Sequence, residues 1–402
     1  MRAPTASAEP IPLLVPDLPS ALEVLPFLQR IDAARWYSNG GPLVRELEAL
    51  LARLTRLHVP GAEALPHLEA AAVANGTASI ELALQAMGVG RGARVLLPSF
   101  TFPATATAVV ARGATPVLAD IDARRWTLTP ELARETLRHT RVDAVLPVAS
   151  FGMPVDVDAW DAFTAETGLP VLVDAAAAFG AQRPGRTTHV SCSLHATKPF
   201  GIGEGGVVLT ADGELAARVR RLANFGFTDG LIAESGGNAK LSEYHAAVGL
   251  AQGQRFELMR AKRAHVAGRY LAVLAAMPDL VALPLAPEGT IRSAMPVRLL
   301  TPIDAGALGA RLAAVQVQTR RWYFPAVHAH PAFATAERVG ADGGPALPAT
   351  EALGPMLLGL PFHAFLGDAQ VARVCGLLRE AVPELRATRR PLRSMRARWR
   401  VA

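Results

Sequence analysis

The segment around Lys198 reads Ser193-Leu194-His195-Ala196-Thr197-Lys198-Pro199-Phe200-Gly201-Ile202-Gly203-Glu204-Gly205-Gly206 and leads into the strand-like Val207-Val208-Leu209-Thr210. Only three of the chain's 41 basic residues are lysines, so an amine here is unusual for this protein. A desolvated amine can lose its proton and condense with a carbonyl group, which a guanidinium cannot do. An ordinary surface lysine in a turn fits the segment equally well, and the rest of the chain has to distinguish the two.

A strand that ends in a carboxylate precedes this segment and reads Leu169-Pro170-Val171-Leu172-Val173-Asp174. It belongs to an alternation of short apolar runs and longer helical patterns. We expect strands at residues 93–98, 116–119, 144–148 and 170–173, and helices at 75–87, 105–112, 130–139 and 157–167. Short apolar strands separated by helices are typical of a mostly parallel sheet covered on both faces. The predicted fold class is therefore α/β.

The two ends of the chain have different patterns. The first stretch, to about Pro42, is rich in proline, and we expect it to be loop-rich. Further elements are expected as helices at 43–57, 214–224, 242–277 and 369–381 and strands at 207–210 and 295–299. A break near residue 255 predicts a large domain over residues 1–255 and a smaller C-terminal α/β domain over residues 256–402.

The composition is that of a soluble globular protein, with 50% hydrophobic and 19% charged residues among 402. The two cysteines, Cys192 and Cys375, form no CxxC motif and suggest no disulfide scaffold, which fits a reducing compartment. The N-terminus lacks the apolar core of a signal peptide, and no apolar run reaches the ~18 residues of a membrane span. We expect a cytoplasmic protein with no membrane partner and no metal.

The C-terminus is rich in arginine. From Arg386 onward the sequence contains seven arginines and no acidic residue. Such a run could bind nucleic acid or another anionic surface. It is more often a solvated tail, and only Trp399 offers an aromatic surface for stacking. The sequence therefore does not favour nucleic acid as a partner.

Two groups suit a phosphorylated pyridine ring. Asp174 follows apolar residues and needs a cationic or N–H partner, which a protonated pyridine nitrogen would provide; capping of the next helix is the alternative. The segment Asn75-Gly76-Thr77-Ala78-Ser79 precedes an apolar helix, so its free N–H groups and the hydroxyls of Thr77 and Ser79 suit a phosphate, although they could simply cap the helix. Ser193 could add another hydroxyl.

Two other motifs each allow more than one interpretation. In Pro98-Ser99-Phe100-Thr101-Phe102-Pro103, either Phe100 or Phe102 could cover a bound ring, and the sequence order does not distinguish them. Residues 201–206 spell GxGxxG, the dinucleotide fingerprint, but that fingerprint requires a preceding strand and a following helix. A strand pattern follows here, so we reject a dinucleotide site.

An activatable lysine, a strand-end aspartate, a phosphate cradle and an aromatic lid are together the parts of a pyridoxal phosphate (PLP) site. The chain also resembles the DegT/DnrJ/EryC1/StrS family of sugar aminotransferases over nearly its whole length. The resemblance rests on WYSNGGPLVRELEALLARL, NGTASIELALQAMGV, PSFTFPATATAVVARGATPVLADID, LPVLVDAAAAFGA, SLHATKPFGIGEGGVVLT, NAKLSEYHAAVGLAQ and TRRWYFPAVHAHPAF. It implies fold type I, with a mostly parallel sheet of the seven-stranded type and a smaller C-terminal domain.

The resemblance also implies roles for individual residues. Lys198 would bind the cofactor covalently and later move a proton between the cofactor and the sugar carbon. Asp174 would stabilise the protonated pyridine nitrogen, and Phe102 would stack on the ring. The family's phosphate-binding positions are occupied by Gly76, Thr77, Ala78 and Ser193. Asn238 corresponds to a residue that reaches the phosphate from the partner subunit, which implies a homodimer with shared active sites.

Two positions depart from the family pattern. Many members have a polar Gln or His three residues after the aspartate, near the cofactor's phenolic oxygen, where this chain has Ala177. Lys240 stands where arginine is frequent. A dehydratase branch of the family replaces the catalytic lysine with histidine; this chain has Lys198, which favours transamination.

The resemblance implies a transaminase that moves an amino group, with L-glutamate as the expected donor, to a nucleotide-linked keto-deoxyhexose for deoxyaminosugar biosynthesis. Arg320, Arg321 and Tyr323 are candidate contacts for the substrate's diphosphate, unless they belong to the interface of the small domain. The alternatives are a PLP-dependent lyase, desulfurase or dehydratase on the same fold, and a non-catalytic regulatory or DNA-binding protein. A desulfurase would need a reactive cysteine.

Overall fold

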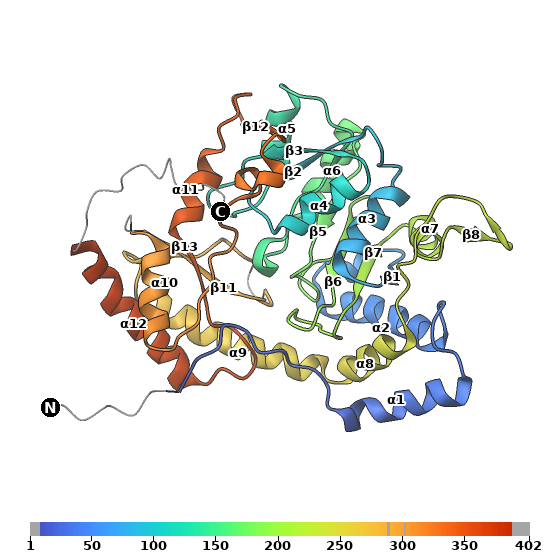
Figure 1. Ribbon diagram of the computed structural model, residues 1–402, viewed down its shortest axis with the longest axis horizontal. Helices are drawn as coiled ribbons and strands as arrows, with labels where there is room; N and C mark the ends of the chain where they lie inside the picture. The colour runs from blue at the N-terminus through green and yellow to red at the C-terminus, as the bar shows by residue number, and fades with distance from the viewer. Residues whose placement is uncertain (1–8, 288–289, 301–302, 388–402) are drawn as a thin grey trace, which may run out of the picture.

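The computed structural model describes residues 9–287, 290–300 and 303–387. Its central feature is a sheet made of two four-stranded parts, with the orders β1-β7-β6-β5 and β4-β2-β3-β12. Isolated parallel bridges from Val145 to Val171 and from Val148 to Asp174 join the two parts edge to edge. Among the described strands of this sheet, antiparallel pairs are formed only by β7 with β1 and with β6. The predicted α/β class with a mostly parallel sheet is confirmed (Figure 1).

The strands of this sheet are β1 (Glu69–Val73), β2 (Arg94–Pro98), β3 (Thr115–Ala119), β4 (Ala144–Val145), β5 (Leu172–Asp174), β6 (His189–Ser193), β7 (Gly206–Thr210) and β12 (Glu337–Val339). Its helices are α1 (Ala21–Ala34), α2 (Pro42–His58), α3 (Gly76–Ala86), α4 (Pro103–Ala111), α5 (Pro130–Leu137), α6 (Val157–Thr167), α7 (Gly213–Ala223) and α8 (Glu243–Gln254), with short 3-10 turns at Ala62–Ala64 and Ser150–Gly152. The predicted strands and helices between residues 75 and 174 all form, within a few residues of the expected bounds.

Helices cover both faces of the sheet because successive strand residues point to opposite sides. In β7, Val207 and Leu209 belong to the apolar cluster that includes α1, α2 and α8. Val208, between them, belongs to the cluster that includes α3, α4 and α7. All three side chains are fully buried, as the wholly apolar strand predicts.

The N-terminal stretch, expected to be loop-rich, also contains one helix that the proline pattern did not predict. Residues 21–34 form helix α1, whose start is fixed by a capping box: Ser20 accepts from the Glu23 N–H, and the Glu23 carboxylate accepts from the Ser20 N–H. Val24, Phe27 and Ile31 are buried at helical spacing. This burial outweighs the break expected from Pro26, which lies inside the helix.

A second, smaller sheet has the order β10-β11-β13. The remaining elements are β8 (Phe227–Thr228), β9 (Leu231–Ile232), α9 (Phe256–Leu274), β10 (Val281–Ala282), β11 (Met295–Leu299), α10 (Ala305–Ala314), α11 (Pro348–Met356), β13 (Leu357–Leu360) and α12 (Asp368–Ala387), with 3-10 turns at Val327–Ala329 and Pro331–Phe333. The helical pattern expected over 242–277 is interrupted at Arg255 between α8 and α9. The domain boundary at residue 255 stays a prediction, since β12 adds to the large sheet beside β3 while Ile11 packs with the second core.

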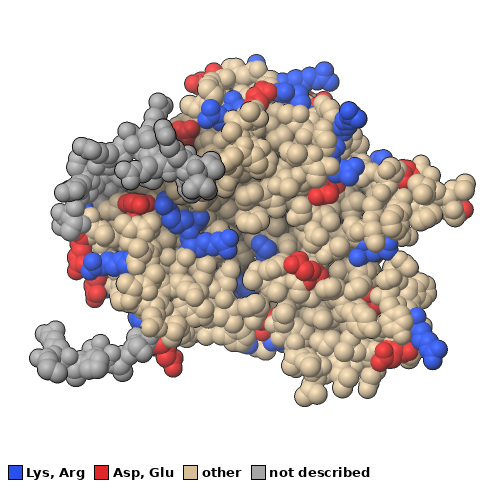
Figure 2. Space-filling model, viewed as in Figure 1, with Lys and Arg blue, Asp and Glu red and all other residues tan. Residues whose placement is uncertain are grey.

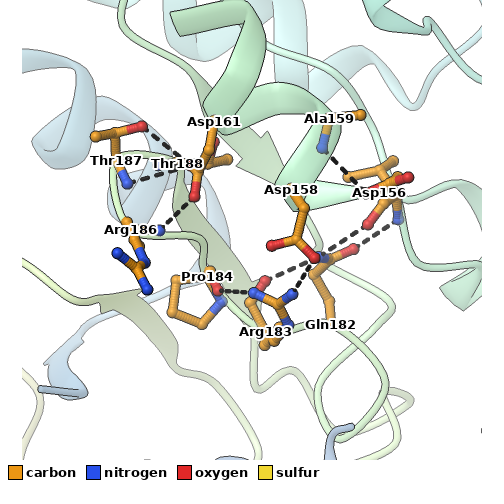
Figure 3. Close-up of polar contacts among 11 residues, drawn as sticks. Asp156, Asp158, Ala159, Asp161, Gln182, Arg183, Pro184, Arg186, Thr187 and Thr188 are labelled. Atoms are coloured by element: carbon orange, nitrogen blue, oxygen red, sulfur yellow. Dashed lines mark hydrogen bonds and ion pairs between the residues drawn. The ribbon is translucent and has the colours of Figure 1, made fainter. Parts of the chain in front are cut away.

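The loop before β6 is tied to helix α6 (Figure 3). Asp161 accepts hydrogen bonds from the backbone N–H groups of Arg186, Thr187 and Thr188. These donors lower the pKa of Asp161, although burial opposes them. The loop leads directly into β6, so this anchor helps to hold the strand that ends at Ser193 and precedes the Lys198 segment.

In the parts of the chain that the structure describes, no helix is both long enough and apolar enough to cross a bilayer. The arginine-rich C-terminus, on which the nucleic-acid question depends, lies outside the described residues except for Arg386 and Ala387.

Candidate active site

A cavity of about 1020 Å³ opens at the carboxyl ends of the parallel strands β2, β4 and β5. This edge is where ligands collect in open α/β sheets. Basic side chains gather around the hollow near the middle of the face shown in Figure 2. Ten of the residues singled out from the sequence line the cavity: Gly76, Thr77, Ala78, Phe102, Asp174, Ser193, Lys198, Asn238, Arg320 and Tyr323.

Asp174 ends β5 and is almost fully buried in the cavity floor. Thr105 Oγ1 donates to its Oδ2 at 2.6 Å, and the Ala176 N–H donates to its Oδ1 at 3.0 Å. Burial raises the pKa of this carboxyl, whereas Thr105, Ala176 and the charge of Lys198 oppose the rise. The carboxylate therefore has part of the stabilisation that a buried charge needs and has room for a cationic partner in the cavity.

Lys198 is partly buried in the same cavity, in the turn between β6 and β7. Burial lowers the pKa of its amine, and the nearby charge of Arg320 lowers it further, while Asp174 acts in the opposite direction. A lower pKa leaves more of the amine neutral near neutral pH, and the neutral amine is the form that attacks a carbonyl.

The expected phosphate cradle is a helix N-terminus packed closely against a strand end. Asn75 caps α3 by accepting from the Ala78 N–H at 2.8 Å. Gly76 is required here, because a Cβ at this position would lie 2.6 Å from the Ser193 Cβ. Backbone N–H groups at the start of α3 and the Ser193 hydroxyl thus meet at one wall of the cavity, which is the arrangement that binds phosphate.

Ser79, which the sequence offered as a further phosphate contact, does not reach this wall. Its hydroxyl is fully buried, donates to the Gly76 carbonyl at 2.7 Å and contacts the Ser191 hydroxyl. The expectation was wrong for Ser79 because the helix turns it toward the sheet. Thr77, two residues earlier, faces the cavity as expected.

The structure separates the two candidate phenylalanines. Phe102 lines the cavity and is 51% exposed, whereas Phe100 is fully buried among Phe151 and Tyr323. Phe102 is therefore the one able to cover a bound ring, in agreement with the family resemblance. Asn238 lines the cavity of its own chain, and its side-chain oxygen accepts from the Lys240 amine at 2.7 Å.

Arg320 and Tyr323 line the cavity, but Arg321 does not. Arg321 points away, toward the Asp304 carboxylate at 3.3 Å and the Pro355 carbonyl at 3.2 Å. It is therefore not placed to touch a ligand in the cavity.

Tyr323 stacks on Phe151, with ring centroids 5.0 Å apart. Burial and the charge of Asp174 raise the pKa of its hydroxyl, which keeps the group protonated.

Several residues in or directly behind the cavity wall have no distinctive sequence signal. Thr105 could have been found only from its position two residues after Pro103 in the helix that follows β2, where it forms a hydrogen-bonded pair with Thr101 at 2.8 Å. His195 and Glu204 flank the lysine turn, 3.8 Å apart, and also line the cavity. Ala177 also lines the cavity, and its methyl group offers no hydrogen bond where many family members have Gln or His.

Residues 23–379 match the DegT/DnrJ/EryC1/StrS aminotransferase family. The chain belongs to this family. Among curated proteins it is 32% identical over 388 residues to protein Rv3402c of Mycobacterium tuberculosis, covering 92% of this chain and 90% of that one. Protein Mb3436c of Mycobacterium bovis has the same identity and coverage.

Solved structures agree with this assignment to the DegT/DnrJ/EryC1/StrS family. DesI, studied in the presence of its TDP-sugar product, is 32% identical with a TM-score of 0.82, covering 95% of this chain and 96% of its own. DesV of S. venezuelae, in complex with a ketimine intermediate, is 29% identical with a TM-score of 0.81, covering 93% and 98%. The chain is a PLP-dependent aminotransferase of fold type I.

Proposed function

We propose that this aminotransferase takes an amino group from L-glutamate and transfers it to a nucleotide-diphospho keto-deoxyhexose, for deoxyaminosugar biosynthesis. The observation that carries the proposal is the meeting of Lys198 and Asp174 in one cavity that also contains the α3 phosphate cradle. DesI, whose structure includes a TDP-sugar product, supports the acceptor class through its similarity over 95% of this chain.

The residues present fit PLP. Gly76 packs so closely against Ser193 that any Cβ at residue 76 would clash with it, and this close packing brings the start of α3 and the Ser193 hydroxyl together as a phosphate cradle. Asp174 is a buried carboxylate with one face toward the cavity and suits a protonated ring nitrogen. Lys198 supplies an amine whose pKa is lowered, and Phe102 an exposed aromatic face. PLP, when bound, supplies an electron sink that makes the carbon–hydrogen bond beside the amino group acidic.

The chain's own residues would perform the other parts of the reaction. Lys198 would hold the cofactor between turnovers and, once displaced by substrate, would carry the proton at Nζ. Asp174 would keep the ring nitrogen protonated, with Thr105 and the Ala176 N–H holding the carboxylate in place. Phe102 and Tyr323, which both line the cavity, would restrict water near the reacting atoms.

The competing activities lack support in the cavity. A desulfurase needs a reactive thiolate, but Cys192 and Cys375 are both buried. Burial raises the pKa of Cys375 to about 11 and that of Cys192 further, so neither thiol ionises near neutral pH. The presence of Lys198 rather than histidine favours amino transfer over the dehydratase reaction.

We also propose that the protein works as a homodimer whose active sites are shared. The hairpin of β8 and β9 supports this because Phe227, Leu231 and Ile232 expose apolar side chains. Asn238 follows this hairpin in the sequence and lines the cavity of its own chain. In a dimer, the Asn238 of one subunit would also reach the cavity of the other.

Single-turnover absorbance measurements test the proposed function. Addition of L-glutamate to the holoenzyme should remove the visible-edge band of the lysine-bound cofactor, and a keto-sugar nucleotide should then restore it. Keto-deoxyhexoses on TDP and UDP, with the keto group at carbon 3 or carbon 4, form the acceptor panel. Loss of the band without its return on any member of the panel would refute the proposed acceptor class while leaving the donor reaction intact.

A further inference from the structure

Arg320 and Arg321 are neighbours in sequence but lie in opposite environments. The backbone of Arg320 pairs with β13: its N–H donates to the Gly359 carbonyl at 3.1 Å, and the Gly359 N–H donates back at 2.7 Å. In extended backbone, successive side chains point to opposite sides. Arg320 therefore lines the cavity, whereas Arg321 turns outward to Asp304.

Arg320 is a cation without a carboxylate partner among the described residues. Its guanidinium lies 5.6 Å from the ring centre of Trp322, which supports the group without neutralising it. The acidic residues that line the same cavity, Glu81, Asp174 and Glu204, form no ion pair with it. An unpaired guanidinium at the wall of a cavity is suited to receive an anion from a ligand.

The position of Arg320 relative to the reacting groups narrows the choice of anion. Its guanidinium lies over Trp322, whose ring centre is 6.1 Å from that of Phe151, and Tyr323 stacks on the same Phe151. Arg320 and Lys198 line one cavity, and the charge of Arg320 lowers the pKa of the Lys198 amine. Arg320 therefore belongs to the part of the cavity that contains this amine.

The two substrates of a transaminase present their anions at different distances from the reacting carbon. In an α-amino acid the carboxylate is bonded directly to the carbon that bears the amino group. In a nucleotide sugar the diphosphate is attached to the anomeric carbon, and the ring separates it from a keto group at carbon 3 or 4. A cation close to the exchanged amine matches the first arrangement and not the second.

We infer that Arg320 binds the α-carboxylate of the amino donor. The inference rests on the proposed aminotransferase reaction and replaces the diphosphate contact expected from the sequence. Guanidinium and carboxylate form paired, parallel hydrogen bonds, so Arg320 would orient the amino acid as well as attract it. This role would also explain how one cavity accepts an amino acid and a sugar in turn, because the sugar has no anionic group beside its keto carbon and does not need Arg320.

The test compares L-glutamate with 4-aminobutanoate, which is glutamate without its α-carboxylate. Holoenzyme is mixed with each amine, and the rate of loss of the visible-edge band is measured by stopped flow. For the wild type, glutamate should react far faster than 4-aminobutanoate. In Arg320→Gln the glutamate rate should fall about 100-fold, typical of losing one partner of a close charged pair, and the 4-aminobutanoate rate should change less than about twofold.

Arg321→Gln is the matched control, since it removes an equal charge from the adjacent residue outside the cavity. It should leave the ratio of the two rates at its wild-type value. Arg320→Lys retains a charge without the paired geometry and should give an intermediate glutamate rate. All variants are first shown to bind PLP, so a folding defect is recognised separately.

Measuring the second half of the reaction shows whether Arg320 binds the amino acid's carboxylate or the sugar nucleotide's diphosphate. The amino form of each enzyme is mixed with the keto-sugar nucleotide, and the sugar concentration that gives half the maximal rate should be unchanged in Arg320→Gln. A raised sugar requirement with a normal glutamate rate would overturn the inference and assign Arg320 to the diphosphate. If the wild type reacts with neither amine, the proposed function itself fails and the inference falls with it.

Discussion

Thr105 Oγ1 and Asp174 Oδ2 form a hydrogen bond of 2.6 Å between two buried side chains that are 69 positions apart in sequence. The bond connects the start of α4 to the end of β5. It holds the Asp174 carboxylate at the cavity floor and favours its charged form. The orientation of Asp174 therefore depends on a residue that has no obvious role when the sequence is considered alone.

Thr105→Val should weaken cofactor binding without unfolding the protein. Valine has nearly the same shape but cannot donate a hydrogen bond, and a bond to a charged group contributes about 1.5–3 kcal/mol. We expect PLP affinity to fall roughly 10- to 100-fold, measured by titrating the apoprotein with PLP and following absorbance. Thr105→Ser is the control, because it retains the hydroxyl and should stay close to the wild type.

Asp174→Asn should make the apoprotein more stable. Burial raises the pKa of Asp174 in the folded protein, so the charged carboxylate destabilises the fold at neutral pH. Removing the charge should raise the unfolding free energy of the apoprotein by about 1–2 kcal/mol, whereas PLP affinity should fall.

The sign of the pH effect follows from the same shift. A raised carboxyl pKa means that the folded state binds the proton more tightly, so wild-type apoprotein recovers this stability as the pH falls through the folded pKa. The difference between Asp174→Asn and the wild type should therefore shrink on acidification, as measured by denaturant unfolding of the apoproteins at several pH values. A difference that is absent at neutral pH, or grows as the pH falls, would contradict this account.

Gly76→Ala should damage the phosphate cradle. Its Cβ would lie 2.6 Å from the Ser193 Cβ, and relief of this clash would displace the start of α3 or the end of β6. We expect at least a tenfold loss of PLP affinity from one displaced phosphate contact. Ser193→Gly is the reference, because it loses the hydroxyl but also lacks the Cβ that would clash. In that background Gly76→Ala should lower PLP affinity less than it does in the wild type; an equal loss in both backgrounds would show that contact with the Ser193 Cβ is not the cause.

Local pattern predicts the alternating elements well but not the elements whose stability comes from packing. Helix α1 contains Pro26, and only the burial of Val24, Phe27 and Ile31 against α8 and its neighbours reveals why it forms. Strand β1 is rich in alanine and β6 contains His, Ser and Cys, so neither has the β-branched composition of a typical strand. Both lie in the large sheet, where the neighbouring strands determine their conformation.

In the site, too, the sequence predicts some residues, whereas others can be placed only from the packing. The residue types at positions 174, 198 and 76–78 point to PLP, and all of them line one cavity. The sequence could not separate Arg320 from Arg321, because the choice depends on how that segment pairs with Gly359. It could not exclude Ser79 either, since the rotation of α3 about its axis determines which hydroxyl faces the phosphate cradle.

Cofactor capture should occur at lower pH than for an unperturbed lysine, because burial and Arg320 lower the pKa of Lys198. The neutral amine reacts, so a lower pKa moves the pH midpoint of the capture rate downward. Arg320→Gln should shift this midpoint upward. Asp174→Asn should shift it downward, since the charge of Asp174 raises the lysine's pKa. Rates of band formation after mixing apoprotein with PLP, measured across pH, check both directions.

The lysine that holds the cofactor can be identified directly, because the chain has only three lysines, Lys198, Lys240 and Lys262. Borohydride reduction of the holoenzyme fixes PLP on its lysine, and mass spectrometry of the digested protein locates the added mass. We expect the added mass on the peptide that contains Lys198, and no adduct in Lys198→Ala. An adduct on Lys240 or Lys262, or an undiminished adduct in Lys198→Ala, would contradict it.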